Sequence, residues 1–354
     1  MHAIIIGAGP AGLAAALALH QQSTPSSPIR VTVLELRPSV QTLGGAVNLT
    51  PLAMRYLDAL GIGPRLRPLG VKVGYIDLVS LRTGSSLGKL WPNVDAIRVL
   101  RHQLVEAMVE AVRAIPDDQI RLRYGVRVTD IEEQGHASSD GSVKVCIVDE
   151  PASGGQESIE GDLVLGCDGI HSFVRSSLVD PHRPKTYSGR ASAYGYIPVS
   201  EAGDAGIVTE NGRPLVNVTT LVSGQLGSLL VTFFEPSLSR LYLANVIAQP
   251  ERLAESDGRR VAGEDKEAVK ADFLRRFGGG KIIGLEDAIK RCEEWVSFPV
   301  YMLPLGGLWS KGRALLLGDA AHAVSAFCRA SANLFSAPTL TNNRRCHRRV
   351  KAPA

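Results

Sequence analysis

The N-terminal part of the chain shows apolar runs separated by glycine-rich and polar breaks. Residues 3–6 form an apolar run that predicts a short, fully buried strand, and the Ala- and Leu-rich stretch 11–21 predicts a helix. After a polar loop at 21–28, the run Arg30-Val-Thr-Val-Leu-Glu35 predicts a second buried strand. This strand–helix–strand order is typical of α/β folds.

Two further helices are expected before the middle of the chain. A glycine-rich loop leads into an amphipathic helix that carries Leu52, Tyr56, Leu57 and Leu60 at helical spacing. The stretch 97–108 predicts another helix with cations in its first turn. A cation there opposes the helix dipole, so Arg101 either has an anionic partner or is a plain surface charge.

The second half of the sequence is richer in strand-like segments. Alternating or β-rich stretches at 191–199, 215–222, 228–234 and 240–248 predict a mostly antiparallel sheet, with a helix at 268–277. Residues 71–90 predict a hairpin that belongs with this sheet, and 135–142 and 150–158 predict hairpin loops.

The break after the first strand carries Gly7, Gly9 and Gly12 in the spacing G-x-G-x-x-G. The first glycine permits a tight turn, the second lets the backbone approach a pyrophosphate, and the third lets helix and strand pack closely. Glu35 ends the second strand, where a ribose hydroxyl needs an acceptor, and an acid there argues against the 2′-phosphate of NADP. The unit therefore predicts a site for NAD or FAD; the alternative is an unrelated strand–turn–helix.

Two more acids follow buried strands. Asp168 stands in Cys167-Asp168-Gly169 ahead of a helix start, where it either binds a ligand or serves only as a cap or turn residue. Asp319 stands in a second Gly-Asp turn and is placed to accept a hydrogen bond from a sugar hydroxyl.

Composition sets bounds on the class of protein. The 354 residues are 45% hydrophobic and 21% charged, with a formal net charge of +4, and the length favours about two domains. The last eleven residues carry five cations and no acid, which indicates a solvated, irregular tail or a contact with nucleic acid or anionic lipid. The five scattered cysteines fit a reducing, cytoplasmic compartment, and we expect no metal site, no transmembrane segment and no signal peptide.

Three motifs in sequence order carry a resemblance to a known family. GAGPAG with Glu35, then GCDGIHSFVR, then GRALLLGDAAHA resemble class A FAD-dependent monooxygenases, in particular the salicylate hydroxylase and zeaxanthin epoxidase group with its fungal secondary-metabolism members. The resemblance covers about residues 2–334. It implies a Rossmann-like FAD-binding domain (GR2-type) with an inserted, mostly antiparallel β-sheet substrate domain.

The resemblance also implies cofactor-binding roles. Gly7, Gly9 and Gly12 match the pyrophosphate cradle, and Glu35 matches the acid that holds the adenosine ribose. Gly45 and Ala46 match the loop near the flavin, and Arg101 matches an arginine that reaches FAD. Asp168 and Gly169 match the Asp-Gly motif that serves FAD and NAD(P)H, Asp319 matches the acid on the ribityl chain, and Ala332 completes the cofactor-binding set.

The implied chemistry is that of the cofactor. NAD(P)H reduces the flavin, which captures O2 as a C4a-hydroperoxide and then hydroxylates or epoxidises a small aromatic or isoprenoid metabolite, an activity typical of secondary-metabolite biosynthesis. We assign no catalytic residue, because the arginine that the family places near Tyr194 or Gly195 is absent and Arg190 stands in another register. Tyr194 either hydrogen-bonds the substrate or packs within its strand. No pattern indicates nucleic acid.

The expected domains are discontinuous. Residues 1–70, 100–178 and 300–335 form the FAD-binding domain, 71–99 and 179–299 form the substrate domain, and 336–354 form the irregular basic tail. The stretch after Phe327 lacks the glycines that the family has there, and Pro338 interrupts its helix. A truncated or frame-shifted end is therefore the hypothesis, with an inactive remnant that binds FAD weakly or not at all as the alternative. A flavin halogenase is less favoured, because its tryptophan-rich motif is missing.

Overall fold

In the computed structural model, the described residues are 1–42, 45–135, 141–149, 155–199, 206–215, 219–248 and 266–324. A six-stranded sheet has the order β20-β21-β12-β1-β2-β8, and all its neighbours are parallel except β20 with β21. Its strands are β1 (His2–Ile6), β2 (Arg30–Glu35), β8 (Ile120–Tyr124), β12 (Leu163–Gly166), β20 (Ser310–Lys311) and β21 (Ala314–Leu316).

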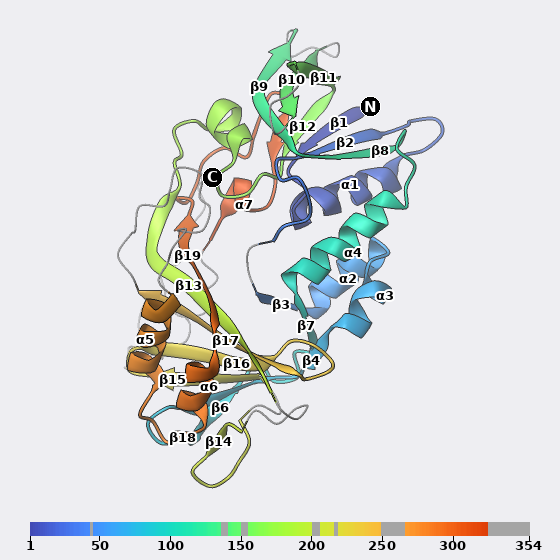
Figure 1. Ribbon diagram of the computed structural model, residues 1–354. Coiled ribbons are helices and arrows are strands. Elements are labelled where there is room, and N and C mark those ends of the chain that lie inside the picture. The colour runs from blue at the N-terminus through green and yellow to red at the C-terminus, as the bar shows by residue number, and fades with distance from the viewer. Residues whose placement is uncertain are drawn as a thin grey trace, which may run out of the picture.

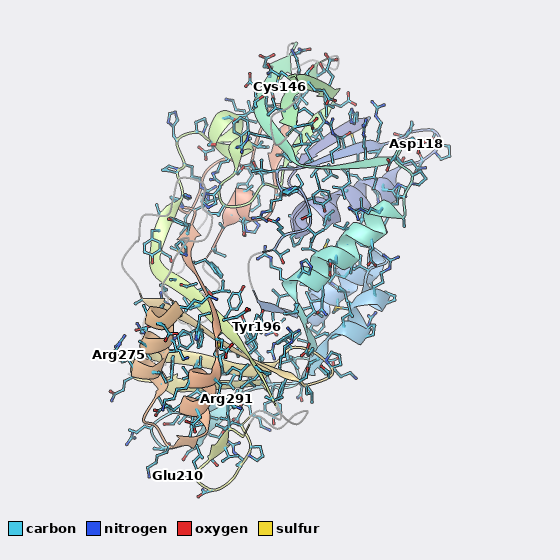
Figure 2. The ribbon with its side chains drawn as sticks, viewed as in Figure 1. Asp118, Cys146, Tyr196, Glu210, Arg275 and Arg291 are labelled. Carbon is cyan, nitrogen blue, oxygen red and sulfur yellow. The ribbon has the colours of Figure 1, made fainter. Side chains whose placement is uncertain are left out.

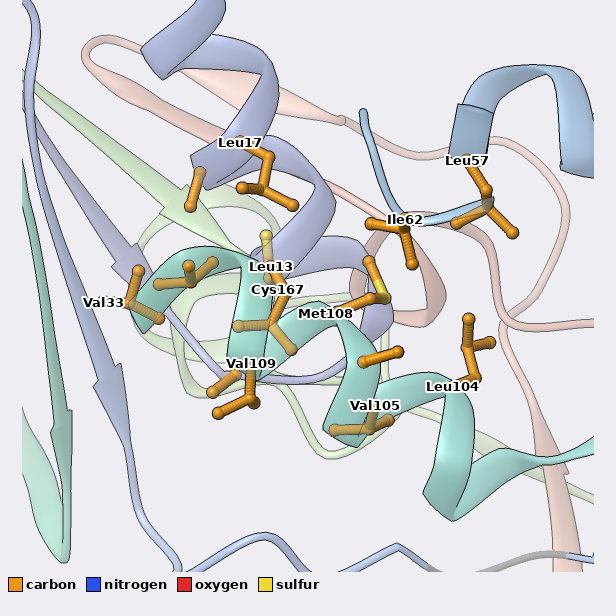
Figure 3. Close-up of a cluster of buried hydrophobic side chains, with 14 of the residues drawn as sticks. Leu13, Leu17, Val33, Leu57, Ile62, Leu104, Val105, Met108, Val109 and Cys167 are labelled. Atoms are coloured by element: carbon orange, nitrogen blue, oxygen red, sulfur yellow. The ribbon is translucent and has the colours of Figure 1, made fainter. Parts of the chain in front are cut away.

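Helices cover one face of this sheet (Figure 1). Helix α1 (Pro10–Gln22) and helix α4 (Arg101–Arg113) pack side by side, and α2 (Pro51–Ala59), α3 (Gly63–Leu66) and η1 (Arg67–Leu69) extend this layer. Figure 3 shows Leu13 and Leu17 of α1 in the same buried cluster as Val105, Met108 and Val109 of α4. Burial of these side chains gives the helices their fixed place against the strands.

A small antiparallel sheet covers the opposite face. It contains β9 (Val126–Gln134), β10 (Ser142–Asp149) and β11 (Glu157–Gly161), in the order β11-β10-β9. Because side chains alternate along a strand, Ile5 of β1 faces the helices whereas Ile4 and Ile6 pack with Val143 and Val145 of β10.

A seven-stranded sheet makes up the other large part of the molecule. Its order is β19-β13-β17-β16-β15-β5-β6, antiparallel throughout except for the parallel pair β15 and β5. The strands are β5 (Ile76–Ser80), β6 (Ser86–Leu90), β13 (Thr186–Pro198), β15 (Thr219–Gly224), β16 (Gly227–Phe233), β17 (Arg240–Ala248) and β19 (Glu294–Met302). Helices α5 (Lys266–Phe277) and α6 (Leu285–Arg291) cover one face, and β14 (Val208–Thr209) pairs with β18 (Ile282–Ile283) nearby.

A three-stranded sheet lies between these two parts (Figure 1). It has the order β3-β7-β4 and consists of β3 (Ala46–Leu49), β7 (Ala96–Leu100) and β4 (Val71–Val73). Strand β7 runs directly into α4, and Ala46 and Leu100 pack against the aromatic face of the seven-stranded sheet. This small sheet therefore touches both large parts.

The structure confirms the predicted α/β fold with a Rossmann-like sheet and a mostly antiparallel second sheet, and it corrects two local predictions. Residues 97–100 were expected to begin a helix but form strand β7, since this segment pairs with both β3 and β4. Leu52 and Tyr56 were expected on the apolar face of α2 but are 54% and 61% exposed, whereas Leu57 is buried as expected, together with Met54. Among the described residues, no helix is long and apolar enough to cross a membrane.

Candidate functional site

In the glycine-rich loop, Gly7 and Gly12 leave no room for a Cβ atom, whereas Gly9 does. A Cβ atom on Gly7 would lie 2.5 Å from the Cys167 carbonyl oxygen, and φ at Gly7 is +103°, so this turn requires glycine. A Cβ on Gly12 would lie 1.9 Å from the Gly7 carbonyl oxygen. A Cβ on Gly9 would meet nothing within 4 Å, so the chain leaves open space there.

This open position borders a pocket of about 230 Å³. Gly9 is also the N-cap of α1 and has no side chain to bond the free N–H groups of the first turn, so these groups remain available to an anion. The pocket is lined by Ala8, Gly9, Pro10, Glu35, Arg37, Ser39, Val40, Gln41, Thr42, Arg101, Val105, Tyr124 and Phe298. Three predicted cofactor residues from distant segments, Gly9, Glu35 and Arg101, thus line one pocket.

Glu35 ties the end of β2 to the glycine-rich loop. Its Oε2 accepts a hydrogen bond from the Ala8 backbone N–H at 2.9 Å, and its Oε1 accepts one from the Arg37 N–H at 2.9 Å. The carboxylate is fixed at the pocket wall, and each of its oxygens can accept a further hydrogen bond.

Two of the lining residues that the sequence analysis did not predict come from other strands. Tyr124 ends β8 opposite Glu35 in the parallel register, and its hydroxyl has no hydrogen-bond partner among the described residues. Burial raises the pKa of this phenol. The sequence offered one signal for Tyr124, because a residue with a polar group ends the strand that pairs with β2 beside Glu35. Phe298 reaches the pocket from β19 of the seven-stranded sheet, and no local pattern indicates that contact.

Arg101 stands at the first position of α4. Its backbone N–H donates to the Gly45 carbonyl oxygen at 3.0 Å, and no carboxylate among the residues described forms an ion pair with its side chain. The neighbouring loop is tightly packed, because a Cβ on Gly45 would lie 2.3 Å from the Tyr242 hydroxyl. A cation at a helix N-terminus without an acidic partner is suited to a bound anion.

Asp168 acts as a cap in the structure. Its Oδ2 accepts hydrogen bonds from the N–H groups of Phe173 at 2.7 Å and Val174 at 3.2 Å, just before η2 (Arg175–Val179). Its Oδ1 is shielded from solvent and has no partner among the described residues, and burial raises the pKa of this carboxyl. Gly169 follows with φ of +77°.

Two arginines join this segment to the second acidic turn. Arg175 donates to the Ile170 carbonyl at 2.7 Å and to the Ala320 carbonyl at 3.0 Å, and Arg183 donates to the Ala321 carbonyl at 3.0 Å. Ala320 and Ala321 belong to the short helix α7 (Asp319–His322), where Asp319 is the exposed first residue. Asp168, Gly169, Gly45, Ala46 and Asp319 do not line the pocket of Gly9, and Ala332, the basic tail and the altered end lie outside the described residues.

Tyr194 packs within an aromatic cluster. It is 7% exposed, and its ring lies 5.7 Å from those of Tyr196 and Tyr242 and 6.3 Å from that of Phe298. Figure 2 shows Tyr196 on the side of the seven-stranded sheet that faces β3, whereas Arg275 and Arg291 lie on the helices of the other side. No group of metal-ligating side chains was found in the described part of the chain.

Comparison with known proteins identifies the class. The family described as FAD binding domain matches residues 1–191, more than half of the chain, so the chain belongs to this family. The cradle around Gly9 fits such a dinucleotide, because the space that a Cβ would fill there borders Glu35 and Arg101. The protein is an FAD-dependent monooxygenase, as the three motifs predicted.

Individual relatives are similar in sequence, and a solved structure is similar in fold. The chain is 28% identical over 331 residues to the phenazine 1,6-dicarboxylic acid hydroxylase PhzS of Lysobacter antibioticus, covering 90% of this chain and 75% of that protein. It is 27% identical over 341 residues to a salicylate hydroxylase of Pseudomonas putida, with coverage of 90% and 70%. The crystal structure of CtdE with FAD and its substrate 4 is similar in fold, with a TM-score of 0.71, 19% identity and coverage of 91% and 75%.

Proposed function

We propose that the chain uses NAD(P)H and O2 to hydroxylate or epoxidise a small aromatic or isoprenoid metabolite. The observation that carries this proposal is the pocket in which Gly9, Glu35 and Arg101 meet beside the free end of α1. The named activities of the relatives, on phenazine 1,6-dicarboxylic acid, 6-hydroxynicotinate and salicylate, support an aromatic substrate. Bound FAD would supply the redox chemistry and the activation of O2.

The residues of the chain would bind and orient this cofactor. Gly7 and Gly12 shape the turn, the N–H groups after Gly9 face the pyrophosphate, and Glu35 accepts from the adenosine ribose. Arg101 supplies a positive charge for the phosphates. The remaining members of the proposed cofactor set are Gly45, Ala46, Asp168, Gly169, Asp319 and Ala332.

The substrate would lie on the aromatic face of the seven-stranded sheet. Tyr194, Tyr196 and Phe298 extend along this face, and Phe298 also borders the nucleotide pocket. Ligand sites favour the junction of two domains. We propose the division given by the sequence, with 1–70, 100–178 and 300–335 binding FAD and 71–99 and 179–299 binding substrate.

The first test is cofactor retention. The purified 354-residue chain is mixed with FAD and desalted, and its visible absorbance is recorded. A retained flavin band is expected, followed by NAD(P)H oxidation that increases with a suitable aromatic compound. A colourless protein with a cooperative unfolding transition would overturn the proposal, because the chain would then fold without holding the cofactor.

The open space at Gly9 gives a sharper test. Gly9→Ala puts a methyl group into the pocket without touching the protein, so it should weaken FAD binding about tenfold and leave the free energy of unfolding of the apoprotein unchanged. Gly74→Ala is the matched control, because a Cβ on Gly74 also meets nothing within 4 Å and Gly74 does not line the pocket. Equal FAD affinity in both variants would contradict the assigned site.

A further inference from the structure

Arg98 is a fully buried arginine that crosses from the small sheet to the seven-stranded sheet. It lies on β7 and is 2% exposed. Its Nη1 donates to the Thr219 hydroxyl at 2.7 Å, to the Thr232 hydroxyl, and to the Phe233 carbonyl at 3.4 Å. These contacts join β7 to β15 and β16, which lie more than a hundred residues further along the chain.

The charge of Arg98 is poorly compensated. No carboxylate in the described part of the chain forms an ion pair with it, and its Nη2 has no hydrogen-bond partner there. Burial lowers the pKa of the guanidinium to about 10, and Tyr242 is the titratable neighbour that opposes this shift. A buried, unpaired cation is costly, so a hydrophobic residue would serve stability better at this position.

Arg98 and Tyr242 belong to the two strands that flank the loop at Gly45 and Ala46, β7 and β17. Ala46 packs against the aromatic cluster that contains Tyr242, and a Cβ atom on Gly45 would lie 2.3 Å from the Tyr242 hydroxyl, so the loop and this side chain are in close contact. Strand β7 reaches the same loop through its backbone, because Leu100 pairs with Ala46 and Arg98 with Asn48. The loop is thus held from the small sheet and from the seven-stranded sheet together.

We propose that Arg98 is a positioning residue that fixes the loop at Gly45 and Ala46 against the seven-stranded sheet and thereby sets the affinity for FAD. The inference rests on the proposed function, in which this loop contacts the cofactor. According to this proposal, the seven-stranded sheet influences cofactor binding directly through the contacts of Arg98 with Thr219 and Thr232.

A double-mutant cycle on the FAD dissociation constant tests this coupling. Arg98→Met should weaken FAD binding on the order of tenfold, and Arg98→Lys should restore part of the loss. Thr232 does not line the pocket, and Thr232→Val should weaken FAD binding several-fold in the native background. In the Arg98→Met background the same change should have no further effect, because the interaction it removes is already gone.

Thr220→Val is the matched control. Thr220 follows Thr219 on β15 and is 1% exposed. Its hydroxyl donates a hydrogen bond to the Leu215 carbonyl and not to Arg98. It should lower the free energy of unfolding as Thr232→Val does while leaving the FAD dissociation constant within twofold. Native chain that fails to bind FAD would defeat the proposed function itself. Native chain that binds FAD, with Arg98→Met and Thr232→Val binding it equally well, would overturn the positioning role alone.

Discussion

The two faces of the seven-stranded sheet bury very different side chains. The face under α5 and α6 is largely apolar, with Val222, Leu229, Val231, Leu241 and Leu243 packed against Phe273 and Phe277. The opposite face, which meets β3 and β7, carries the tyrosine cluster, two buried threonines and Arg98.

This difference between the two faces indicates that one contributes mainly to the stability of the fold and the other mainly to the positioning of the site. An apolar face against helices gains free energy from buried area and needs no polar partners. A face that buries phenols, hydroxyls and an arginine gains less, because each polar group must replace its lost water. We therefore expect substitutions on the helix-covered face to change folding, and substitutions on the tyrosine face to change how the site responds to pH and ligand.

The largest effect is expected on the helix-covered face. Phe273 is fully buried, and its ring lies 4.2 Å from that of Trp295. Phe273→Ala should lower the free energy of unfolding by about 3–5 kcal/mol, as measured by urea denaturation, and leave FAD affinity unchanged where the protein is folded. Leu226→Ala, at an exposed position, should change it by less than about 0.5 kcal/mol. A comparable loss of unfolding free energy in Phe273→Ala and Leu226→Ala would contradict the stabilising role given to the helix-covered face.

An intermediate effect is expected at alkaline pH on the tyrosine face. Burial raises the pKa of Tyr242 well above its ordinary value of 10.0. Above that pH the unfolded chain releases the phenol proton and the folded chain keeps it, so the free energy of unfolding falls by up to about 1.4 kcal/mol per pH unit. Tyr242→Phe should remove this part of the slope in denaturation curves taken above pH 10.

Tyr56→Phe is the control for that slope. Tyr56 is 61% exposed on α2, so its loss should leave the alkaline slope of the native chain unchanged. Parallel slopes for the native chain and Tyr242→Phe would mean that the tyrosine face opens to solvent before the rest of the protein unfolds.

The smallest effect is an absence of reaction at Cys292. This thiol is fully buried between β13 and α6, and burial raises its pKa to about 11. At pH 8, the native chain and Cys292→Ala should therefore show the same number of reactive thiols when folded, and differ by one when unfolded. Reaction of one extra thiol in the folded native chain would show that the helix-covered face is loosely packed.

Regular elements were predictable from the sequence where one strand or helix is governed by its own pattern. Strands 30–35 and 240–248 have the predicted bounds, and α1 differs from its prediction by one residue at each end. The segment 97–100 was mistaken for helix, because its pairing with β3 and β4 outweighed the helical spacing that continues into α4.

The candidate site was predictable to the extent that its residues lie at element ends. Gly9, Glu35 and Arg101 were expected to act together and line one pocket. Tyr124 and Phe298 were missed, since their places depend on strand register and on contact between two sheets. Arg98 gave no local sign either, because its partners stand far along the chain.

Arg175 and Arg183 have a consequence for anyone who exchanges segments between this enzyme and its relatives. Both side chains donate hydrogen bonds to main-chain carbonyl oxygens of α7, the short helix that begins at Asp319. A chimera that takes its Asp168 region from one parent and its Asp319 region from another will keep these contacts whatever side chains α7 carries, since they are made to backbone. Crossover points between residues 184 and 318 should therefore leave these contacts intact, whereas a crossover between Ile170 and Arg175 would separate Arg175 from the Ile170 carbonyl that orients its side chain.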